Sequence, residues 1–463
     1  MNPKLPRIFA YLNIATVAAI AAIVAGFGFG NPTASAAELP VPKVSEVTRV
    51  NPGQRPGPME AQTSNFILKT KPQATLGDAY VIITDLTRDA YLNALDKLAA
   101  FHKGTVVRVQ NLATLSGEGT GSKTEREQLR AKLCELKPKF VAIAPKPESF
   151  TEDMLSGLWK LLSALDGKSK SQLPVFPGLL IAPNQAAFES LIERSINYKP
   201  QPASRVRPFI VGQVTSPQPH DMRALQKVRM MRNMFADYGC PAQSLVVRSY
   251  NAVQAGATVA PVPNEWQAEM TAPRQALDAI PAPAKQALDG ASLLIMFGHG
   301  LPGEVCSMDV RAFRDVSMSG KIILCGDCYT APQMVARSAP QSAQQGADGT
   351  STPPSSPAKR GGPKGAKGAN GPRMSPGKGI DNSFAMRAVQ NGAMVVFAHM
   401  RENMGFPHLF PVLENWTDGL TVGEAYQRLM NAIMAGNQRP DGDLLLYAII
   451  GDPALQPFEK MKK

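Results

Sequence analysis

Two short apolar runs in the second half of the chain each end in glycine and a reactive side chain. The run LLIMF at 293–297 is followed by Gly298, His299 and Gly300. The run IIL at 322–324 is followed by the residues CGDC, which end at Cys328. Short apolar runs that stop at glycine are typical of buried strands in a parallel sheet. If these strands are neighbours, about 5 Å apart, an imidazole and a thiol meet at the carboxyl edge of the sheet, where open α/β folds place their sites.

A thiol beside an imidazole indicates attack on an amide carbonyl. The thiol supplies the nucleophile, and a histidine, with an unperturbed pKa of about 6.5, is suited to give a proton to the leaving amine. Cys325 directly follows the apolar run, so we expect it to belong to the strand. Cys328 lies where the strand turns toward the next helix, so its own backbone N–H can face the carbonyl of a substrate. We therefore favour Cys328 as the nucleophile and keep Cys325 as the alternative.

The same side chains permit a different chemistry. Cys325 and Cys328 form a C-x-x-C pair, which Cys306 and His299 would complete as a zinc site with three thiolates and one imidazole. The C-x-x-C pair alone would suit a thiol-redox protein. Structural zinc sites usually combine two such turns, and this chain has one. A metal or redox function therefore stays a weaker alternative.

Three further residues are candidates for supporting roles at the same edge. Asp327 directly precedes Cys328. His399 ends an apolar run at 393–398, which predicts that it reaches the same edge of the sheet. Glu402 follows shortly after and can line a pocket for a basic side chain.

The rest of the chain predicts the sheet that such a site needs. Strands are expected at 79–85, 105–111, 139–145 and 174–183, and helical apolar spacing separates them at 89–102, 125–136, 152–165 and 186–196. This alternation favours a parallel sheet covered on both faces. A second series begins with a strand at 206–214 and a helix at 222–238. The segment 265–288 is rich in alanine and is expected to be helical, interrupted by Pro273, Pro281 and Pro283.

The order of these motifs resembles that of the gingipain family of caspase-like cysteine peptidases. The similar features are His299-Gly300, Cys328, the segment SFAMRAVQNGAMVVFAHM at 383–400 and the closing helix with its Gly-Asp-Pro ending at 421–455. The resemblance covers roughly 80–460. It implies an α/β protein with two side-by-side parallel-sheet α/β units, the second being a caspase-like (Rossmann-like) three-layer catalytic unit.

The resemblance also implies roles for individual residues. Cys328 would be the nucleophile and His299 the proton donor, while the N–H groups of Gly300 and Cys328 would bind the oxyanion. A protein or peptide would be the substrate, with no cofactor and no metal. The chain departs from the family in its first unit, which lacks the family's acidic residues and Gly-Arg segment, so a strict preference for Arg or Lys is not supported. This departure keeps open a catalytically inactive relative that uses the fold for binding. Asp327 also stands where the family has Ala or Gly.

The N-terminus predicts export. Residues 1–36 combine Lys4 and Arg7, an uncharged apolar run at 8–30 and a small-residue ASAA pattern, as in a cleaved signal peptide. We expect a secreted, periplasmic or cell-surface protein, membrane-anchored if the segment is not cleaved. A Pro-rich leader at 37–77 would precede a first α/β subdomain at 78–204 and a catalytic subdomain at 205–463, the latter carrying a disordered insertion at 338–378.

Composition excludes one class of partner. The net charge of +12 is unevenly placed, because the insertion holds six basic residues and one acidic residue. No basic face is interleaved with aromatic residues, so no nucleic acid is expected as a partner. The five cysteines are an odd number, which leaves at least one thiol unpaired within the chain.

Overall fold

The computed structural model describes residues 76–116, 120–167, 172–216, 219–257, 262–273, 275–332, 383–401, 406–436 and 446–462. The expected signal peptide, nearly all of the leader and the insertion at 338–378 lie outside these residues. Within them, no helix is long and apolar enough to cross a membrane.

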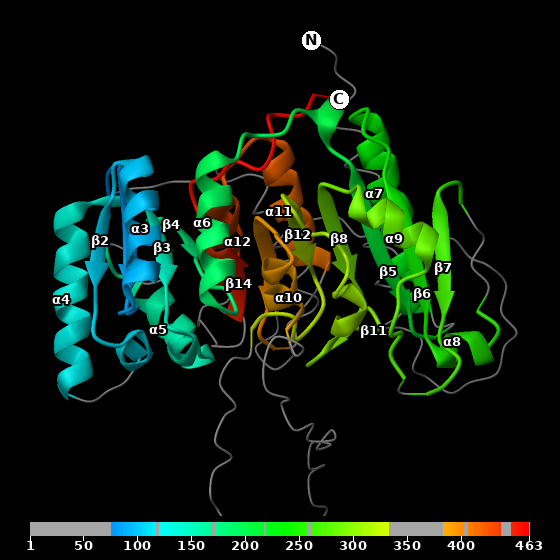
Figure 1. Ribbon diagram of the computed structural model, residues 1–463, viewed down its shortest axis with the longest axis horizontal. Coiled ribbons are helices and arrows are strands. Elements are labelled where there is room, and N and C mark those ends of the chain that lie inside the picture. The colour runs from blue at the N-terminus through cyan, green and yellow to red at the C-terminus, as the bar shows by residue number, and fades with distance from the viewer. Residues whose placement is uncertain are drawn as a thin grey trace, which may run out of the picture.

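Eleven strands form one twisted sheet that spans the molecule, in the order β2-β1-β3-β4-β14-β13-β12-β8-β5-β6-β7 (Figure 1). Their bounds are β1 Ala79–Thr84, β2 Thr105–Arg108, β3 Pro138–Ala144, β4 Phe176–Leu179, β5 Pro208–Val214, β6 Gln243–Arg248, β7 Glu265–Glu269, β8 Leu293–Phe297, β12 Ile322–Cys325, β13 Val395–His399 and β14 Tyr447–Ile450. Neighbouring strands pair in parallel except β13 and β14. The expected α/β class with a mostly parallel sheet is confirmed.

Helices cover both faces of the sheet. Their bounds are α3 Asp89–His102, α4 Thr120–Leu136, α5 Glu152–Ser163, α6 Gln185–Asn197, α7 Pro219–Asp237, α8 Tyr250–Gln254, α9 Ala282–Asp289, α10 Phe384–Gln390, α11 Phe406–Thr417 and α12 Val422–Gly436. Helices α3, α6 and α10 pack on one face, and α5, α11 and α12 pack on the other. Because both faces are covered, strands such as β8 and β12 are buried along their whole length, which explains their uninterrupted apolar sequences.

One prediction for the second half of the sheet was wrong. The segment expected to be a helix from 265 to 288 begins as the edge strand β7 and becomes helical only at α9. β7 pairs with β6, and Trp266 stacks on Phe209 of β5 at a centroid distance of 6.0 Å. Tertiary packing therefore overrides the helical preference of its alanines, and the helix begins only at Ala282, after Pro281.

The strand β14 joins the two halves of the sheet. It pairs antiparallel with β13 over four residues and in parallel with β4 through Ile450 and Leu179. Directly after it, the buried carboxylate of Asp452 accepts a hydrogen bond from the Tyr80 hydroxyl at 2.9 Å and lies 2.7 Å from Nε2 of His102. The C-terminal segment is thereby fixed to the first α/β unit at the edge of the sheet opposite the expected site.

Between β8 and β12 the chain forms a separate three-stranded antiparallel sheet rather than a helix. Its strands are β9 Gly300–Leu301, β10 Glu304–Val305 and β11 Met308–Asp309, in the order β11-β10-β9. Two-residue turns join them. The second turn, Cys306-Ser307, has positive φ angles of 49° and 56° at its two residues, as a type I′ turn requires.

Candidate active site

The strand register brings His299 and Cys328 to the same edge of the sheet. β8 and β12 are parallel neighbours, and Cys325 pairs with Met296. His299 lies three residues beyond Met296, and Cys328 lies three residues beyond Cys325. The Gly326 N–H donates to the Met296 carbonyl at 2.8 Å, so the two chains remain side by side just past the strands. The two strands are therefore neighbours, which is the condition that the sequence prediction required.

The two glycines around His299 are required because other atoms approach their Cα atoms closely. A Cβ on Gly300 would lie 2.0 Å from the Cys328 carbonyl oxygen, and a Cβ on Gly298 would lie 2.5 Å from Oε1 of Gln213. Neither distance is compatible with a side chain. The His299–Gly300 backbone is thus packed directly against the backbone of Cys328.

Gln213 is a positioning residue that sequence reasoning missed. It lies in β5, is 5% exposed, and its Oε1 accepts the His299 N–H at 2.6 Å. Its Nε2 donates to the Ser307 hydroxyl in the turn between β10 and β11. The signal was a polar side chain in an otherwise apolar strand, because buried amides are retained where they satisfy specific partners.

The chain after Cys328 is held by the end of β13. Tyr329 has a positive φ of 55°, and its N–H donates to the Arg401 carbonyl at 3.2 Å. The Ala331 N–H donates to the His399 carbonyl at 2.9 Å. A strained turn of this kind persists only where its surroundings fix it, so β13 holds the loop that carries Cys328.

His399 occupies the expected edge, but as a buried residue in a hydrogen-bonded position. It is 1% exposed, and its Nδ1 lies 2.6 Å from the Arg401 carbonyl oxygen and 3.1 Å from the Arg401 backbone nitrogen. Its ring packs edge-on against Tyr447 at a centroid distance of 4.4 Å. The guanidinium of Arg401 forms an ion pair with Glu152 at the start of α5. His399 and Arg401 therefore connect the Cys328 loop to the first unit. Glu402, the other expected supporting residue, lies outside the described residues.

The three cysteines near the site differ in burial. Cys328 is half-buried, whereas Cys325 and Cys306 are fully buried. Burial raises the pKa of the Cys325 thiol well above its usual range, and the nearby Asp327 carboxylate adds to the rise. The pKa of the Cys306 thiol is raised in the same way. Because the thiolate is the reactive form, these two thiols are poor nucleophiles in the folded protein.

Asp327 is buried between these thiols. Its side chain is fully covered, and its Oδ2 accepts the Cys306 N–H at 2.6 Å. Burial raises the pKa of the carboxyl, while hydrogen bonding by Cys306, the nearby Gly298 N–H and the charge of His299 oppose that rise.

The described residues do not gather a metal site. No three His, Cys, Asp or Glu side chains among them are placed to hold a metal ion, which counts against the zinc set of Cys306, Cys325, Cys328 and His299. All five cysteines fall within the described part of the chain, and none forms a disulfide.

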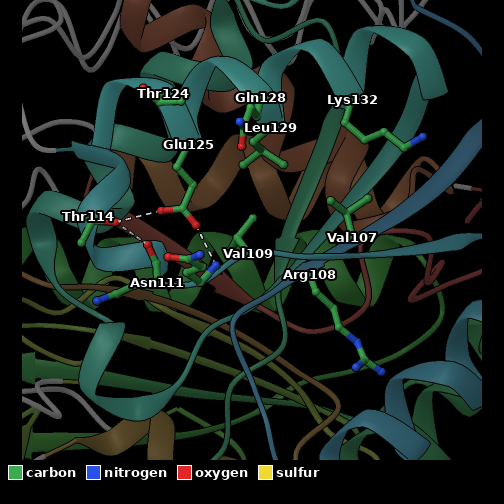
Figure 2. Close-up of a pocket in the computed structure, with 11 residues that line it drawn as sticks. Val107, Arg108, Val109, Asn111, Thr114, Thr124, Glu125, Gln128, Leu129 and Lys132 are labelled. Carbon is green, nitrogen blue, oxygen red and sulfur yellow. Dashed lines mark hydrogen bonds between the residues drawn. The ribbon is translucent and has the colours of Figure 1, made fainter. Parts of the chain in front are cut away.

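A hollow of about 1060 Å³ lies elsewhere, at the end of the sheet beside β2 and α4 (Figure 2). Glu125 on α4 reaches across it and accepts hydrogen bonds from the Gln110 N–H at 2.6 Å and the Thr114 hydroxyl at 3.2 Å. Five strands separate β2 from β12, so this hollow is not part of the His299 and Cys328 site.

Comparison with solved structures identifies the architecture. The chain is similar to the crystal structure of gingipain R, an Arg-specific cysteine proteinase, with a TM-score of 0.51, 12% identity, and coverage of 85% of this chain and 81% of that one. It is also similar to the complex of the pro- and mature domains of RgpB from Porphyromonas gingivalis, with a TM-score of 0.49, 12% identity, and coverage of 83% and 80%. No family model matches the chain, and no curated protein matches it. At this identity the likeness concerns the fold, and the chain has the caspase-like α/β fold of gingipain R.

Proposed function

We propose that this protein is a cysteine endopeptidase in which Cys328 is the nucleophile and His299 the general acid. The observation that carries the proposal is the register of β8 and β12, in which Met296 pairs with Cys325. His299 and Cys328 each lie three residues beyond this pair, at the same edge of the sheet. The gingipain-like fold supports the same reading, because that architecture is used by a cysteine proteinase.

The proposed reaction follows from the groups at this edge. The Cys328 thiol gives its proton to His299 as its sulfur forms a bond to the substrate carbonyl carbon, the carbon–nitrogen bond breaks, and the leaving amine takes that proton from His299. A water molecule then attacks the thioester and gives a proton to His299. The carbon–sulfur bond breaks, the acid is released, and His299 returns the proton to the Cys328 sulfur. The backbone N–H groups of Gly300 and Cys328 would stabilise the oxyanion in both steps.

The geometry of β9 supports the assignment of Gly300. Leu301 and Glu304 close a two-residue turn, and Gly300 pairs with Val305 one step further out. In such a hairpin the closing pair exchanges both hydrogen bonds, so the next pair out directs its N–H and C=O groups away from the partner strand. The Gly300 N–H is therefore not used by β10 and is available to a substrate oxygen.

Burial supports Cys328 over Cys325. A substrate carbonyl can reach the half-buried Cys328, whereas Cys325 is enclosed at the end of β12 with a raised pKa. The assignments of residues 1–36 as a signal peptide and of the protein as exported are predictions from the sequence.

The decisive experiment compares wild type with Cys328→Ala, His299→Ala and Cys325→Ala. A thiol-reactive peptidyl probe should label wild type at Cys328, as shown by mass spectrometry, and a peptide library should be cleaved by wild type and Cys325→Ala. Cys328→Ala and His299→Ala should be inactive yet folded, and combining them should cost little beyond either alone, because the two residues act as a unit. Labelling at Cys325, or full activity of Cys328→Ala, would show that the wrong thiol was chosen. A wild type that neither cleaves nor reacts would refute the peptidase function.

A further inference from the structure

Asp327 is a buried carboxyl group that the proposed reaction does not use. The side chain is fully covered, and only Oδ2 has a well-formed hydrogen bond, from the Cys306 N–H at 2.6 Å. Oδ1 accepts no such bond from any residue that the structure describes. A buried carboxyl oxygen without a well-formed hydrogen bond is costly to the folded state, so the presence of Asp327 at this position requires an explanation.

The position of Asp327 in the chain supplies one. It directly precedes Cys328 in the loop after β12. Its hydrogen-bond partner, Cys306, begins the turn that follows β10. β10 pairs with β9, which starts at Gly300. One side chain therefore links the loop that carries the nucleophile to the hairpin that carries the oxyanion donor.

The packing around this link is tight. A Cβ on Gly300 would lie 3.1 Å from the Asp327 Cβ, and a Cβ on Gly298 would lie 3.3 Å from the Cys306 sulfur. The turn at Cys306 adopts positive φ angles at two residues other than glycine. Such a conformation is unfavourable for side chains, so it persists only where neighbouring groups hold it in place. The Asp327 carboxylate accepts the N–H of Cys306, while the Gln213 amide and the Leu277 N–H hold Ser307.

We propose, on the basis of the peptidase function proposed above, that Asp327 is a positioning residue that fixes the β9–β10 hairpin, and with it His299 and Gly300, against the Cys328 loop. Its contribution is geometric, because it acts through the Cys306 N–H and not on the substrate. A small residue at this position would leave the Cys306 N–H and the turn without their acceptor.

The proposal predicts different results for two substitutions. Asp327→Ala removes the acceptor, so kcat should fall by about 100-fold, the cost of a displacement of about 1 Å at a reacting centre, while KM changes little. Asp327→Asn keeps an amide oxygen that can accept the Cys306 N–H, and should restore kcat to within about 10-fold of wild type. The alkylation rate of Cys328 by iodoacetamide, which needs no oxyanion donor, should stay within about 3-fold in both variants.

Asp85 offers a matched control. It is 1% exposed and also accepts backbone N–H groups, from Lys146 at 2.6 Å and Leu112 at 3.0 Å, but it lies in the first unit after β1. Asp85→Asn should lower stability without lowering the kcat of the folded enzyme. If Asp327→Ala behaves in the same way, with an unchanged kcat, Asp327 has only a structural role and the proposal is overturned.

The link can also be tested without peptidase activity. Hydrogen–deuterium exchange at the Cys306 amide and across residues 300–309 should be at least about 10-fold faster in Asp327→Ala than in wild type, with Asp327→Asn in between. If the wild type neither cleaves peptides nor reacts with the peptidyl probe, but Asp327→Ala still exchanges faster than wild type, the peptidase function is refuted and the positioning role of Asp327 is retained. Unchanged exchange in Asp327→Ala would refute the positioning role whatever the activity of the protein.

Discussion

Substituting Gly300 by alanine tests the contact on which the whole site depends. The added Cβ would lie 2.0 Å from the Cys328 carbonyl oxygen and 3.0 Å from the Cys328 carbonyl carbon. Ordinary contacts between such atoms are about 3.5 Å, so one of the two backbones must move by about 1 Å. Neither is a flexible side-chain end that can swing aside.

The movement has two measurable consequences. Overpacking of this kind destabilises a folded protein by about 1–3 kcal/mol, which urea denaturation measures. A displacement of about 1 Å between nucleophile and oxyanion donor should lower kcat/KM for peptide cleavage by about 100-fold. Without denaturant the variant should still be mostly folded, so the fall in kcat/KM should be much larger than the fall in the folded fraction. The loss of activity should also persist at temperatures where the variant is fully folded.

Gly290 provides the comparison. A Cβ there would meet its nearest atoms, the carbonyl oxygens of Ala287 and Gln286, at 3.7 and 3.8 Å. Gly290→Ala should therefore change stability by no more than about 0.5 kcal/mol and leave kcat/KM unchanged. If Gly300→Ala is as stable and as active as Gly290→Ala, β9 does not abut the Cys328 backbone and the site as described is wrong.

Three further predictions concern residues around the site and the joint between the units. Gln213→Leu removes the acceptor of the His299 N–H, so kcat should fall by about 10-fold with a stability loss of about 1–3 kcal/mol, checked by steady-state kinetics and urea denaturation. Lys321, buried before β12, has a pKa lowered to about 8 by burial. Because the unfolded chain keeps its proton up to about pH 10.4, wild type should gain stability on the order of 1–3 kcal/mol as the pH rises from 8 to 10, and Lys321→Met should lack this gain in denaturation curves. Tyr80→Phe removes the buried hydrogen bond to Asp452 and should cost about 1–3 kcal/mol in denaturation experiments without changing kcat.

Each of these predictions has an outcome that contradicts it. Full activity in Gln213→Leu would mean that the backbone alone orients His299. A stability difference between wild type and Lys321→Met that stays constant across this pH range would mean that the two carbonyls accepting from its Nζ offset the cost of burial. A large loss of kcat in Tyr80→Phe would show that the far edge of the sheet influences the site.

The strands of the site could be predicted from the sequence because the sheet is covered on both faces. Burial on both sides forces uninterrupted apolar runs such as β8 and β12, and glycine marks the point where each chain leaves the sheet. His299 and Cys328 stand out for the same reason, as reactive residues at those exits. That the two strands are neighbours was a condition of the prediction, and the pairing of β8 with β12 meets it.

The parts that could not be predicted depend on contacts between residues distant in sequence. β7 carries an alternating, partly polar sequence whose extended form is set by pairing with β6 at the edge of the sheet. The role of the Arg401 carbonyl in holding Tyr329 involves only backbone atoms, so no residue type indicates it. The hydrogen bond between Asp327 and Cys306 could be predicted only if the segment between β8 and β12 were known to form a hairpin. Strands of two residues, such as β9 and β10, are too short to give a recognisable sequence pattern.

The central place of β14 also sets the order in which the molecule can assemble. A chain delivered from its N-terminus completes β1 to β4, and later β5 to β13, before the strand that lies between these two groups has emerged. Until then β4 and β13 are both open edges, the type of surface that pairs wrongly with other chains. The contact between Leu179 and Ile450 spans most of the chain, and such long-range pairing forms slowly. We therefore expect the pairing of β14 with β4 and β13 to form late, and expect these two edges to be open to wrong pairing until it does.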